Sequence, residues 1–266
     1  MGAAVGFFRR VWVCTAVLFV WSGFLPTAFS QNLTVQSGST FNLGSGTLDL
    51  GCGDMTVAGG LAIGSGTALT VRNVDISGGD LSLGSGLISL SGDWVNRGSF
   101  TAGTGRVNVV DGCGSALSRL AGNSDFYQLA VASSAGRTLE AEAGSIQTFA
   151  NRLTLKGTSA NLLRIRSSQT GSSSFFQLAA RGTQDIFAVD VADNDASGGQ
   201  VLVPQPPAGA GSVDSGSNSN WFVPLVQGAV AIFTLPAPAL LLLTLLLILV
   251  AMPFRHIPGR GRADHE

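Results

Sequence analysis

Apolar residues along the chain recur in closely spaced pairs with a period of twenty residues. Each pair is followed by Gly-Ser-Gly, and the pairs are Phe41 with Leu43, Leu61 with Ile63, and Leu81 with Leu83. Two apolar side chains separated by one residue lie on the same face of a β-strand. Gly-Ser-Gly gives the backbone the freedom for a sharp turn. The pattern predicts short strands with tight corners, repeated over residues 41–105.

A second set of apolar pairs follows each Gly-Ser-Gly turn. We align Leu48 and Leu50 with Leu69 and Val71, and then with Ile88 and Leu90. One such coil cannot bury its apolar face, but stacked coils form a continuous core. The prediction is an all-β fold, a parallel β-solenoid (β-helix) whose coils rise by ~4.8 Å. In it, Leu43, Ile63 and Leu83 touch from coil to coil.

The repeat loosens beyond residue 105, where Gly103-Thr104-Gly105 is about two positions out of phase, but strand-like segments continue. Their separation by Gly, Ser, Asn and Asp suits either further coils or a β-sandwich. Trp94 and Phe100 are expected to be core or coil-closing aromatics, and residues 217–222 resemble the closing strand of bacterial surface β-helix repeats. The predicted solenoid ectodomain therefore covers residues 31–223.

Composition agrees with a folded, turn-rich domain. Charged residues make up 12% of the chain, and there are 36 glycines. A flexible Gly/Ser-rich stalk is the alternative, but a stalk has no need of paired apolar residues in register. The formal net charge of −1 gives no basic surface for nucleic acid, so no nucleic-acid partner is expected.

The N-terminal residues have the order of a secretory signal peptide. Arg9 and Arg10 precede the apolar stretch 11–26, and small residues lie near Ser30. This predicts a signal peptide over residues 1–30 that is cleaved between Ser30 and Gln31. An uncleaved anchor is the alternative, although the apolar stretch is short for a membrane span.

The C-terminal residues predict a membrane anchor. Residues 229–252 contain no charge, and a helix of that length can cross a hydrocarbon core of ~30 Å. A short tether, 224–228, precedes it, and a basic tail, 253–266, follows it. By the positive-inside rule the tail is cytoplasmic, which puts the ectodomain in the periplasm or at the cell surface.

The same segment resembles the C-terminal sorting tails read by exosortase-type membrane proteases. The resemblance is carried by Thr234-Leu235-Pro236, by Pro236-Ala237-Pro238, by the Leu-rich stretch and by the Arg cluster that begins at Arg255. Both signatures are incomplete, since Phe233 replaces the Pro of the Ile-Pro-Thr-Leu type and Ala237 replaces the Glu of the Pro-Glu-Pro type. The resemblance implies a sorting protease as partner and cleavage near Pro236. A plain anchor that is never processed is the alternative.

The ectodomain resembles the Gly-rich β-helical passengers of bacterial surface and adhesin-like proteins, over residues 35–223. This resemblance implies an exported structural or adhesin-like protein of the cell surface or extracellular matrix, rather than an enzyme. Its expected partners are the membrane, surface polysaccharide and other surface proteins. No cofactor is expected.

Candidate chemistry is confined to carboxylates. His256 and His265 are the only histidines, and both lie in the tail, so the ectodomain lacks the histidine of a Ser-His-Asp or zinc site. Paired acids in a groove would make a carbohydrate-active lyase or hydrolase, and oxygen ligands would make a Ca²⁺-binding module. Asp and Asn are also ordinary turn residues, which is the default interpretation here. The candidate acids are Asp185, Asp190, Asp193 and Asp195.

Two cysteines remain in the ectodomain once Cys14 leaves with the signal. Cys52 and Cys113 each lie in Gly-Cys-Gly, and an oxidising compartment favours a disulfide between them. The repeat places them three coils apart, about 14 Å along the stack, whereas a disulfide needs Cα atoms within ~7 Å. Either the intervening coils are arranged differently from this register, or the thiols are unpaired.

Overall fold

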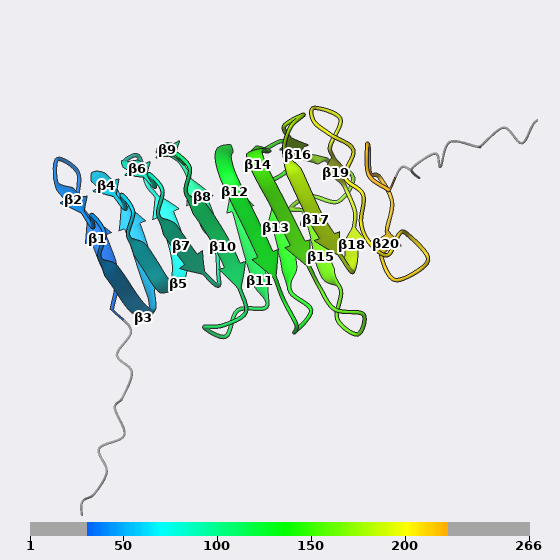
Figure 1. Ribbon diagram of the computed structural model, residues 1–266, viewed down its shortest axis with the longest axis horizontal. Helices are drawn as coiled ribbons and strands as arrows, with labels where there is room; N and C mark the ends of the chain where they lie inside the picture. Colours follow the sequence, from blue (N-terminus) through cyan, green and yellow to red (C-terminus); the bar gives the residue numbers. More distant parts are fainter. Residues whose placement is uncertain (1–30, 223–266) are drawn as a thin grey trace, which may run out of the picture. The chain divides into compact units, whose positions relative to one another are not determined.

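The computed structural model describes residues 31–222, which form a parallel β-solenoid of about eight coils (Figure 1). The predicted signal peptide 1–30 and tether 224–228 lie outside the described residues, as do the membrane segment 229–252 and the basic tail 253–266. Among the residues described, no helix is long and apolar enough to span a membrane.

Each coil passes through three strand positions, which stack into three faces along the long axis (Figure 1). Several strands bend at a corner and contribute to two faces. Face 1 contains β2 (Thr40–Asn42), β4 (Gly60–Ala62), β6 (Asp80–Ser82), β9 (Ser99–Thr101), the first parts of β12 (Ser124–Ala132) and β14 (Ile146–Lys156), β16 (Ser174–Leu178) and β19 (Asn194–Asp195). Face 2 contains the first parts of β3 (Thr47–Val57) and β5 (Thr67–Ile76), β7 (Leu87–Leu90), β10 (Arg106–Val110), the second parts of β12 and β14, and β17 (Thr183–Phe187). Face 3 contains β1 (Leu33–Val35), the second parts of β3 and β5, β8 (Trp94–Asn96), β11 (Leu117–Ala121), β13 (Thr138–Ala141), β15 (Leu163–Ser167), β18 (Val189–Val191) and β20 (Val213–Asp214).

The predicted stacking of the repeat is confirmed. The N–H of Leu43 donates to the carbonyl of Ala62 at 2.8 Å, and Ile63 makes the equivalent bond to Ser82. Ile63 and Leu83 are fully buried, and Leu43 packs against the same core from the first coil. The later strands stack in the same way, since β12, β14 and β16 pair in parallel. The β-sandwich alternative is therefore wrong, and further coils continue the solenoid.

One predicted register is wrong by a single residue. Leu48 aligns with Ala68, not with Leu69, and Ala68 in turn aligns with Ile88. Ala68 is fully buried, whereas Leu69 is only partly buried on the outer side of face 2. The cause is the corner at Thr70, whose φ of 51° accommodates an irregularity before Val71 returns to the core. Periodicity alone cannot locate such an irregularity.

Glycine is required where consecutive corners approach each other closely. Gly64 has a φ of +70°, and a Cβ on it would lie 2.6 Å from the carbonyl oxygen of Gly44 in the preceding coil. Gly84 repeats this geometry against Gly64, at 2.4 Å. The Gly-Ser-Gly units therefore serve both the turn and the stacking distance. The next coil is one residue shorter. The N–H of Thr104 donates to Gly84 just as the N–H of Ser85 donates to Gly64, and Thr104 follows Ser85 by nineteen residues. Gly103-Thr104-Gly105 is therefore one position out of phase with the twenty-residue repeat, and not two.

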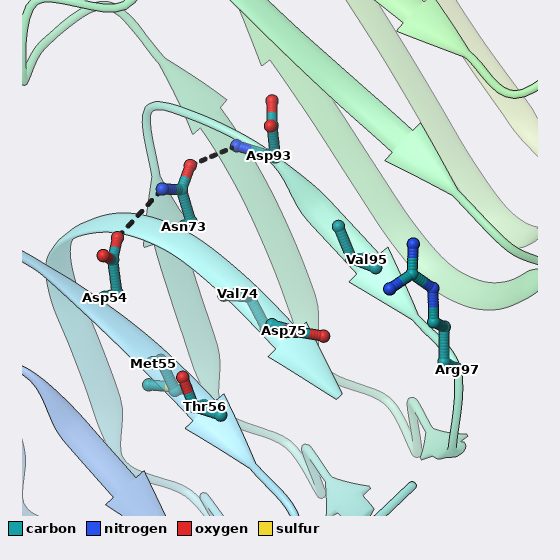
Figure 2. A pocket seen from close by; sticks show the side chains of 9 residues that line it. All are labelled: Asp54, Met55, Thr56, Asn73, Val74, Asp75, Asp93, Val95 and Arg97. Atoms are coloured by element: carbon teal, nitrogen blue, oxygen red, sulfur yellow. Dashed lines mark hydrogen bonds between the residues drawn. The ribbon is translucent and has the colours of Figure 1, made fainter. Parts of the chain in front are cut away.

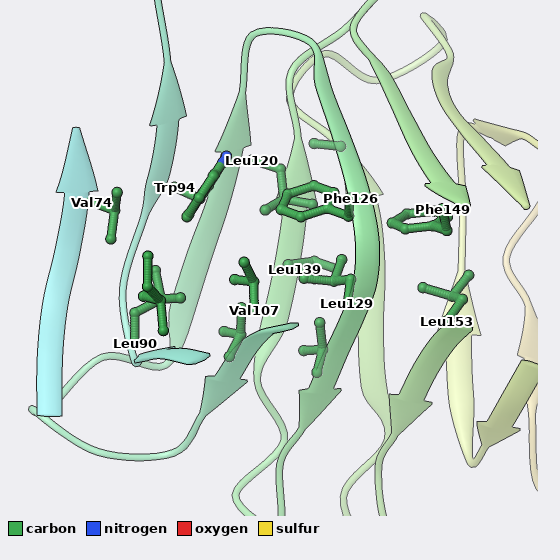
Figure 3. Close-up of a cluster of buried hydrophobic side chains, with 14 of the residues drawn as sticks. Val74, Leu90, Trp94, Val107, Leu120, Phe126, Leu129, Leu139, Phe149 and Leu153 are labelled. Carbon is green, nitrogen blue, oxygen red and sulfur yellow. The ribbon is translucent and has the colours of Figure 1, made fainter. Parts of the chain in front are cut away.

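An aromatic cluster fills the middle of the core (Figure 3). Trp94 is fully buried, as predicted, and its ring centroid lies 4.8 Å from that of Phe100 and 5.4 Å from that of Phe126. Phe126 stacks on Phe149 at 6.1 Å, and Phe149 contacts Phe176 at 5.5 Å. Rings from successive coils thus form a column that runs along the inside of face 1. Such pairs add specific geometry to the area they bury.

The last coil is closed by the segment that precedes the predicted tether. Trp221 is 5% exposed, and it forms a parallel bridge with Leu202. Its indole N–H donates to Asn194 Oδ1 at 2.7 Å, which satisfies a buried polar group. Residues 217–222 therefore cover the C-terminal end of the core, but they do so through isolated bridges at Ser219 and Trp221 and not as the closing strand expected from the sequence.

Candidate functional site

The outer surface of face 3 carries charged side chains that form ion pairs between neighbouring coils. The pairs that touch are Arg72–Asp54 (2.6 Å), Arg119–Asp93 (3.9 Å), Arg119–Glu140 (3.0 Å) and Arg166–Asp190 (2.6 Å). Glu140 and Arg166 occupy the same register on neighbouring strands. We call this set the charge ladder: Asp54, Arg72, Asp93, Arg119, Glu140, Arg166 and Asp190.

The parallel stack explains why the signs alternate. Side chains at one register position on neighbouring strands lie roughly 4.8 Å apart, and like charges placed directly opposite each other destabilise a sheet. At the register position shared by Asp93, Arg119, Glu140 and Arg166, alternation turns this repulsion into attraction. Arg72 and Asp190 lie off that position, since Asn73 aligns with Asp93 and Asp190 aligns with Arg164. The hydrogen bond from Arg72, with its positive charge, holds the pKa of Asp54 below its usual value despite partial burial. Because exposed ion pairs are weak, the ladder sets the regularity of the surface more than the stability of the core.

A shallow recess lies on the charge ladder between the first and third coils (Figure 2). Asn73 spans it, donating to Asp54 Oδ1 at 2.9 Å and accepting from the backbone N–H of Asp93 at 2.8 Å. Asp75 and Arg97 also line the recess, and Asp75 Oδ1 has no hydrogen-bond partner among the described residues. The recess therefore offers hydrogen-bonding groups to a polar surface ligand rather than an enclosed cavity.

The second distinctive feature is a loop, residues 111–116, that joins β10 to β11. It carries Cys113, which forms a disulfide with Cys52 at a Cα–Cα distance of 5.4 Å. The strand that carries Cys52, β3, and the strand before Cys113, β10, are indeed three coils apart, as the register predicts. The two Cα atoms come close because the loop lies back over the intervening corners, where Gly112 and Cys113 line a recess together with Thr70 and Ser91. Neither alternative expected from the sequence applies, because the coils keep their register and the cysteines are paired.

Arg137 anchors the base of this loop. Its side chain is fully buried and donates to four oxygens: the Ser91 carbonyl at 2.5 Å, Ser118 Oγ at 2.6 Å, and the carbonyls of Val110 and Ser115 at 2.9 and 2.8 Å. One side chain from the fifth coil thus binds the third and fourth coils together. Five guanidinium donors in a rigid fork make arginine suited to this role.

Asp111 supplies the counter-charge for Arg137. Arg137 Nε lies 3.5 Å from Asp111 Oδ1, which is ion-pair distance, although Nε makes no hydrogen bond. Burial raises the pKa of Asp111, but hydrogen bonds from Ser133, Ser134 and Ala135 and the charge of Arg137 outweigh burial and leave the pKa below its usual value. Burial also lowers the pKa of Arg137, and Asp111 opposes that shift.

The candidate acids Asp185, Asp190 and Asp195 are held by separate partners. Asp185 pairs with Lys156 at 2.8 Å and with Arg152 at 3.3 Å on face 2, and Lys156 is the main reason its pKa is lowered. Asp190 belongs to the charge ladder on face 3 and also accepts from Ser215 Oγ at 2.7 Å.

Asp193 and Asp195 lie at the following corner. Asp193 is a corner residue with a φ of 56° and is 7% exposed. Asp195 accepts from the backbone N–H of Ser197, two residues on, at 2.7 Å, as a turn aspartate does. Within residues 31–222, no three His, Cys, Asp or Glu side chains are grouped so that they could hold a metal ion.

Sequence reasoning missed the charge ladder and Arg137. The ladder had a signal, because a charged residue of alternating sign recurs at one position of the repeat once Asp93, Arg119 and Glu140 are aligned. Arg137 gave no such signal in the sequence, because it follows a glycine at a corner, where an exposed arginine is also common. Its burial depends on four oxygens that other coils supply.

No protein-family model, no curated protein and no solved structure matches the chain. The functional inference therefore rests on the fold and on the surface of the solenoid. Its most distinctive features are the charge ladder, the recess beside it and the disulfide-bound loop.

Proposed function

We propose that this protein is an exported structural or adhesin-like component of a cell surface or extracellular matrix, in which the solenoid is a rigid, extended unit. The observation that carries the proposal is the Cys52–Cys113 disulfide, which links the first coil to the fourth. Disulfides of this kind persist in oxidising, extracytoplasmic compartments. A bond that joins separate coils also restrains them against local opening, which suits a protein exposed to the outside.

The surface supports a role in contact rather than in catalysis. The charges of face 3 are largely neutralised by their neighbours, and the formal net charge is −1. Such a surface presents regularly spaced hydrogen-bonding groups with little long-range field. Its partners in this proposal are surface polysaccharides or other surface proteins, which are recognised by hydrogen bonds along the stack.

The two ends of the sequence supply the route to the surface in this proposal. The signal peptide directs export with cleavage before Gln31, and the apolar segment 229–252 then holds the protein in the inner membrane. A sorting protease that acts near Pro236 releases the ectodomain from its basic tail. These segments lie outside the described residues, and the support for this step is the sequence alone.

A carbohydrate-cleaving enzyme is the less favoured alternative. Two-carboxylate hydrolysis needs a pair of acids facing each other across a site about 5–10 Å wide. Asp185 and Asp190 lie on different faces, each in its own ion pair, and Asp195 is engaged in its own turn. The same dispersal gives a Ca²⁺-binding module no oxygen cage at these residues.

The test is to express the full chain in a bacterium that has an exosortase-type protease and to locate it. We expect a surface-exposed protein with N-terminal Gln31, without residues 255–266, whose gel mobility shifts on reduction. Cys113→Ser is the matched control, which should reach the surface without that shift. A chain that remains in the cytoplasm, with free thiols and both termini intact, would disprove the proposal.

A further inference from the structure

The N-terminal end of the solenoid is an open edge. Phe41, Leu61 and Leu81 occupy one register position in the first three coils, and their exposed fractions are 38%, 2% and 1%. Each later member of this series is covered by the coil before it. Phe41 has no such cover in the described part of the chain, although it faces the same core direction.

Backbone N–H groups at the same edge have no neighbouring strand to donate to within residues 31–222. In the second coil the N–H groups of Gly60, Ser65 and Thr67 donate to Ser39, Gly44 and Gly46 of the first coil, at 2.8–2.9 Å. The corresponding donors of the first coil are at Thr40, Ser45 and Thr47, and no strand of residues 31–222 precedes them on faces 1 and 2.

The terminal strands differ from face to face. On face 3 the terminal strand is β1, which pairs with the second part of β3 and has no strand of residues 31–222 on its other side. β2 and the first part of β3 are left without a preceding strand at the end of the stack (Figure 1). We call these two segments, residues 40–50, the open edge. Its combination of strand-spaced donors and alternating apolar side chains fits another extended strand.

The open edge has few of the features that normally block strand addition. Natural edge strands are protected by charges, prolines or bulges, yet residues 40–50 contain no proline and a single charge, Asp49, just before the irregularity of β3. The other end of the solenoid is protected, with Trp221 covering the core and with Pro204, Pro206 and Pro207 in the last coil. The two ends therefore differ in kind, and only the N-terminal one is suited to docking.

We propose that the open edge binds the open edge of a second copy of this chain, which gives a head-to-head dimer with two-fold symmetry. A two-fold axis makes β2 of one copy antiparallel to β2 of its partner, so donors and acceptors of one edge meet those of an identical edge. The same symmetry brings like charges together, which disfavours self-association of most surfaces. Here Asp49 is the sole charged residue between 31 and 53, so little repulsion arises.

A dimer of this kind goes beyond a role as surface component, because it joins two solenoids into one continuous core of about sixteen coils. It buries both copies of Phe41 and places the closing residues 217–222 of each copy at the two far ends. The inference depends on the first coil and not on how the chain is exported.

The experiment measures the mass of the full chain, purified in detergent, by analytical ultracentrifugation with the detergent contribution subtracted. We compare the wild type with Phe41→Lys, which puts a charge into the dimer interface. Phe187→Lys is the matched control, since Phe187 is 40% exposed and lies in the seventh coil. The wild type and Phe187→Lys should both be dimers, and Phe41→Lys should raise the dimer dissociation constant by about tenfold or more.

A second variant tests the backbone part of the interface. Thr40→Pro removes one free donor of the edge and no hydrogen bond to the second coil, and proline is tolerated on edge strands. It should weaken the dimer while the circular dichroism spectrum and the Cys52–Cys113 bond are retained. The proposal is overturned by a monomeric wild type, which would mean that another segment covers the edge. It is equally overturned by folded Phe41→Lys and Thr40→Pro variants that dimerise as the wild type does, which would place the contact elsewhere.

Discussion

Cys52 lies on β3 and Cys113 follows β10, a strand three coils away, yet their Cα atoms are 5.4 Å from each other because loop 111–116 folds back along the stack. The bond therefore crosses the corners of the second and third coils instead of joining neighbours. It links residues separated by 61 positions in the chain. Arg137 holds the other side of the same loop through the carbonyls of Val110 and Ser115. A covalent and a hydrogen-bonded anchor thus act on one short segment.

Removing the disulfide should destabilise the solenoid. Cys113→Ser frees a long loop in the unfolded chain, and the free energy of unfolding should fall by about 2–4 kcal/mol. The measurement is urea unfolding followed by tryptophan fluorescence. A reductant should lower the stability of the wild type to a similar level and leave the variant unchanged. Equal stability of the oxidised wild type and the variant would contradict this prediction.

Replacing Arg137 should be more damaging than replacing an exposed arginine. Arg137→Met leaves four buried or half-buried oxygens and Asp111 without their partner, and the expected loss is about 3–5 kcal/mol. Arg106→Met is the control, since Arg106 is exposed on face 2 and makes no ion pair within residues 31–222. Its effect should stay within about 0.5 kcal/mol. Comparable losses for the two variants would argue against the anchoring role.

The corrected register predicts opposite behaviour for two similar side chains. Ile88 is fully buried, so Ile88→Ala should lower the free energy of unfolding by about 2–5 kcal/mol. Leu69 lies toward the outside of face 2, so Leu69→Ala should lose less than about 1 kcal/mol. Denaturant unfolding of the two variants decides between the registers. A large loss for Leu69→Ala would restore the alignment of Leu69 with the core.

The corner glycines allow the stacking distance to be tested separately from the turn. Gly44 and Gly64 both have a positive φ, +66° and +70°, so either substitution by alanine carries the strain of about 1–2 kcal/mol for a left-handed residue. A Cβ on Gly44 meets nothing within 4 Å, whereas one on Gly64 meets the Gly44 oxygen at 2.6 Å. Gly64→Ala should therefore melt at a clearly lower temperature than Gly44→Ala. Similar melting temperatures would mean that adjacent coils are not in close contact here.

The charge ladder predicts a dependence of stability on acid. The pKa of Asp54 in the folded protein is below its unfolded value of about 3.9, so the folded state binds its proton more weakly. The resulting stabilisation is complete above that unfolded value and is lost as the pH falls through the lower folded pKa. The stability difference between the wild type and Asp54→Asn should thus shrink between pH 5 and pH 2. Arg72→Gln should show the same narrowing, and a difference independent of pH would contradict the pairing.

The stacked-coil architecture could be predicted from the sequence because a twenty-residue period forces equivalent residues into contact. Leu61, Ile63, Leu81 and Leu83 are buried as that period requires, and Trp94 is in the core. The alignment failed at Leu69 because an irregular corner displaces a strand by one residue without changing composition or spacing. The candidate acids were assigned from proximity in the chain. Sequence neighbours on alternate faces or corners do not share a site, as Asp190 and Asp195 show.

The amino-acid sequence by itself determined the period, the glycine corners and the apolar residues that each coil buries, since these are local and repeat with the backbone. Only the tertiary structure decided which side chains from different coils meet: Cys52 with Cys113, Arg119 with Asp93 and Glu140, and Arg137 with the loop it anchors. The physical reason is that these contacts depend on the path of a loop and on the register of parallel strands. A shift of one residue changes both, and the local pattern of apolar and polar residues constrains neither.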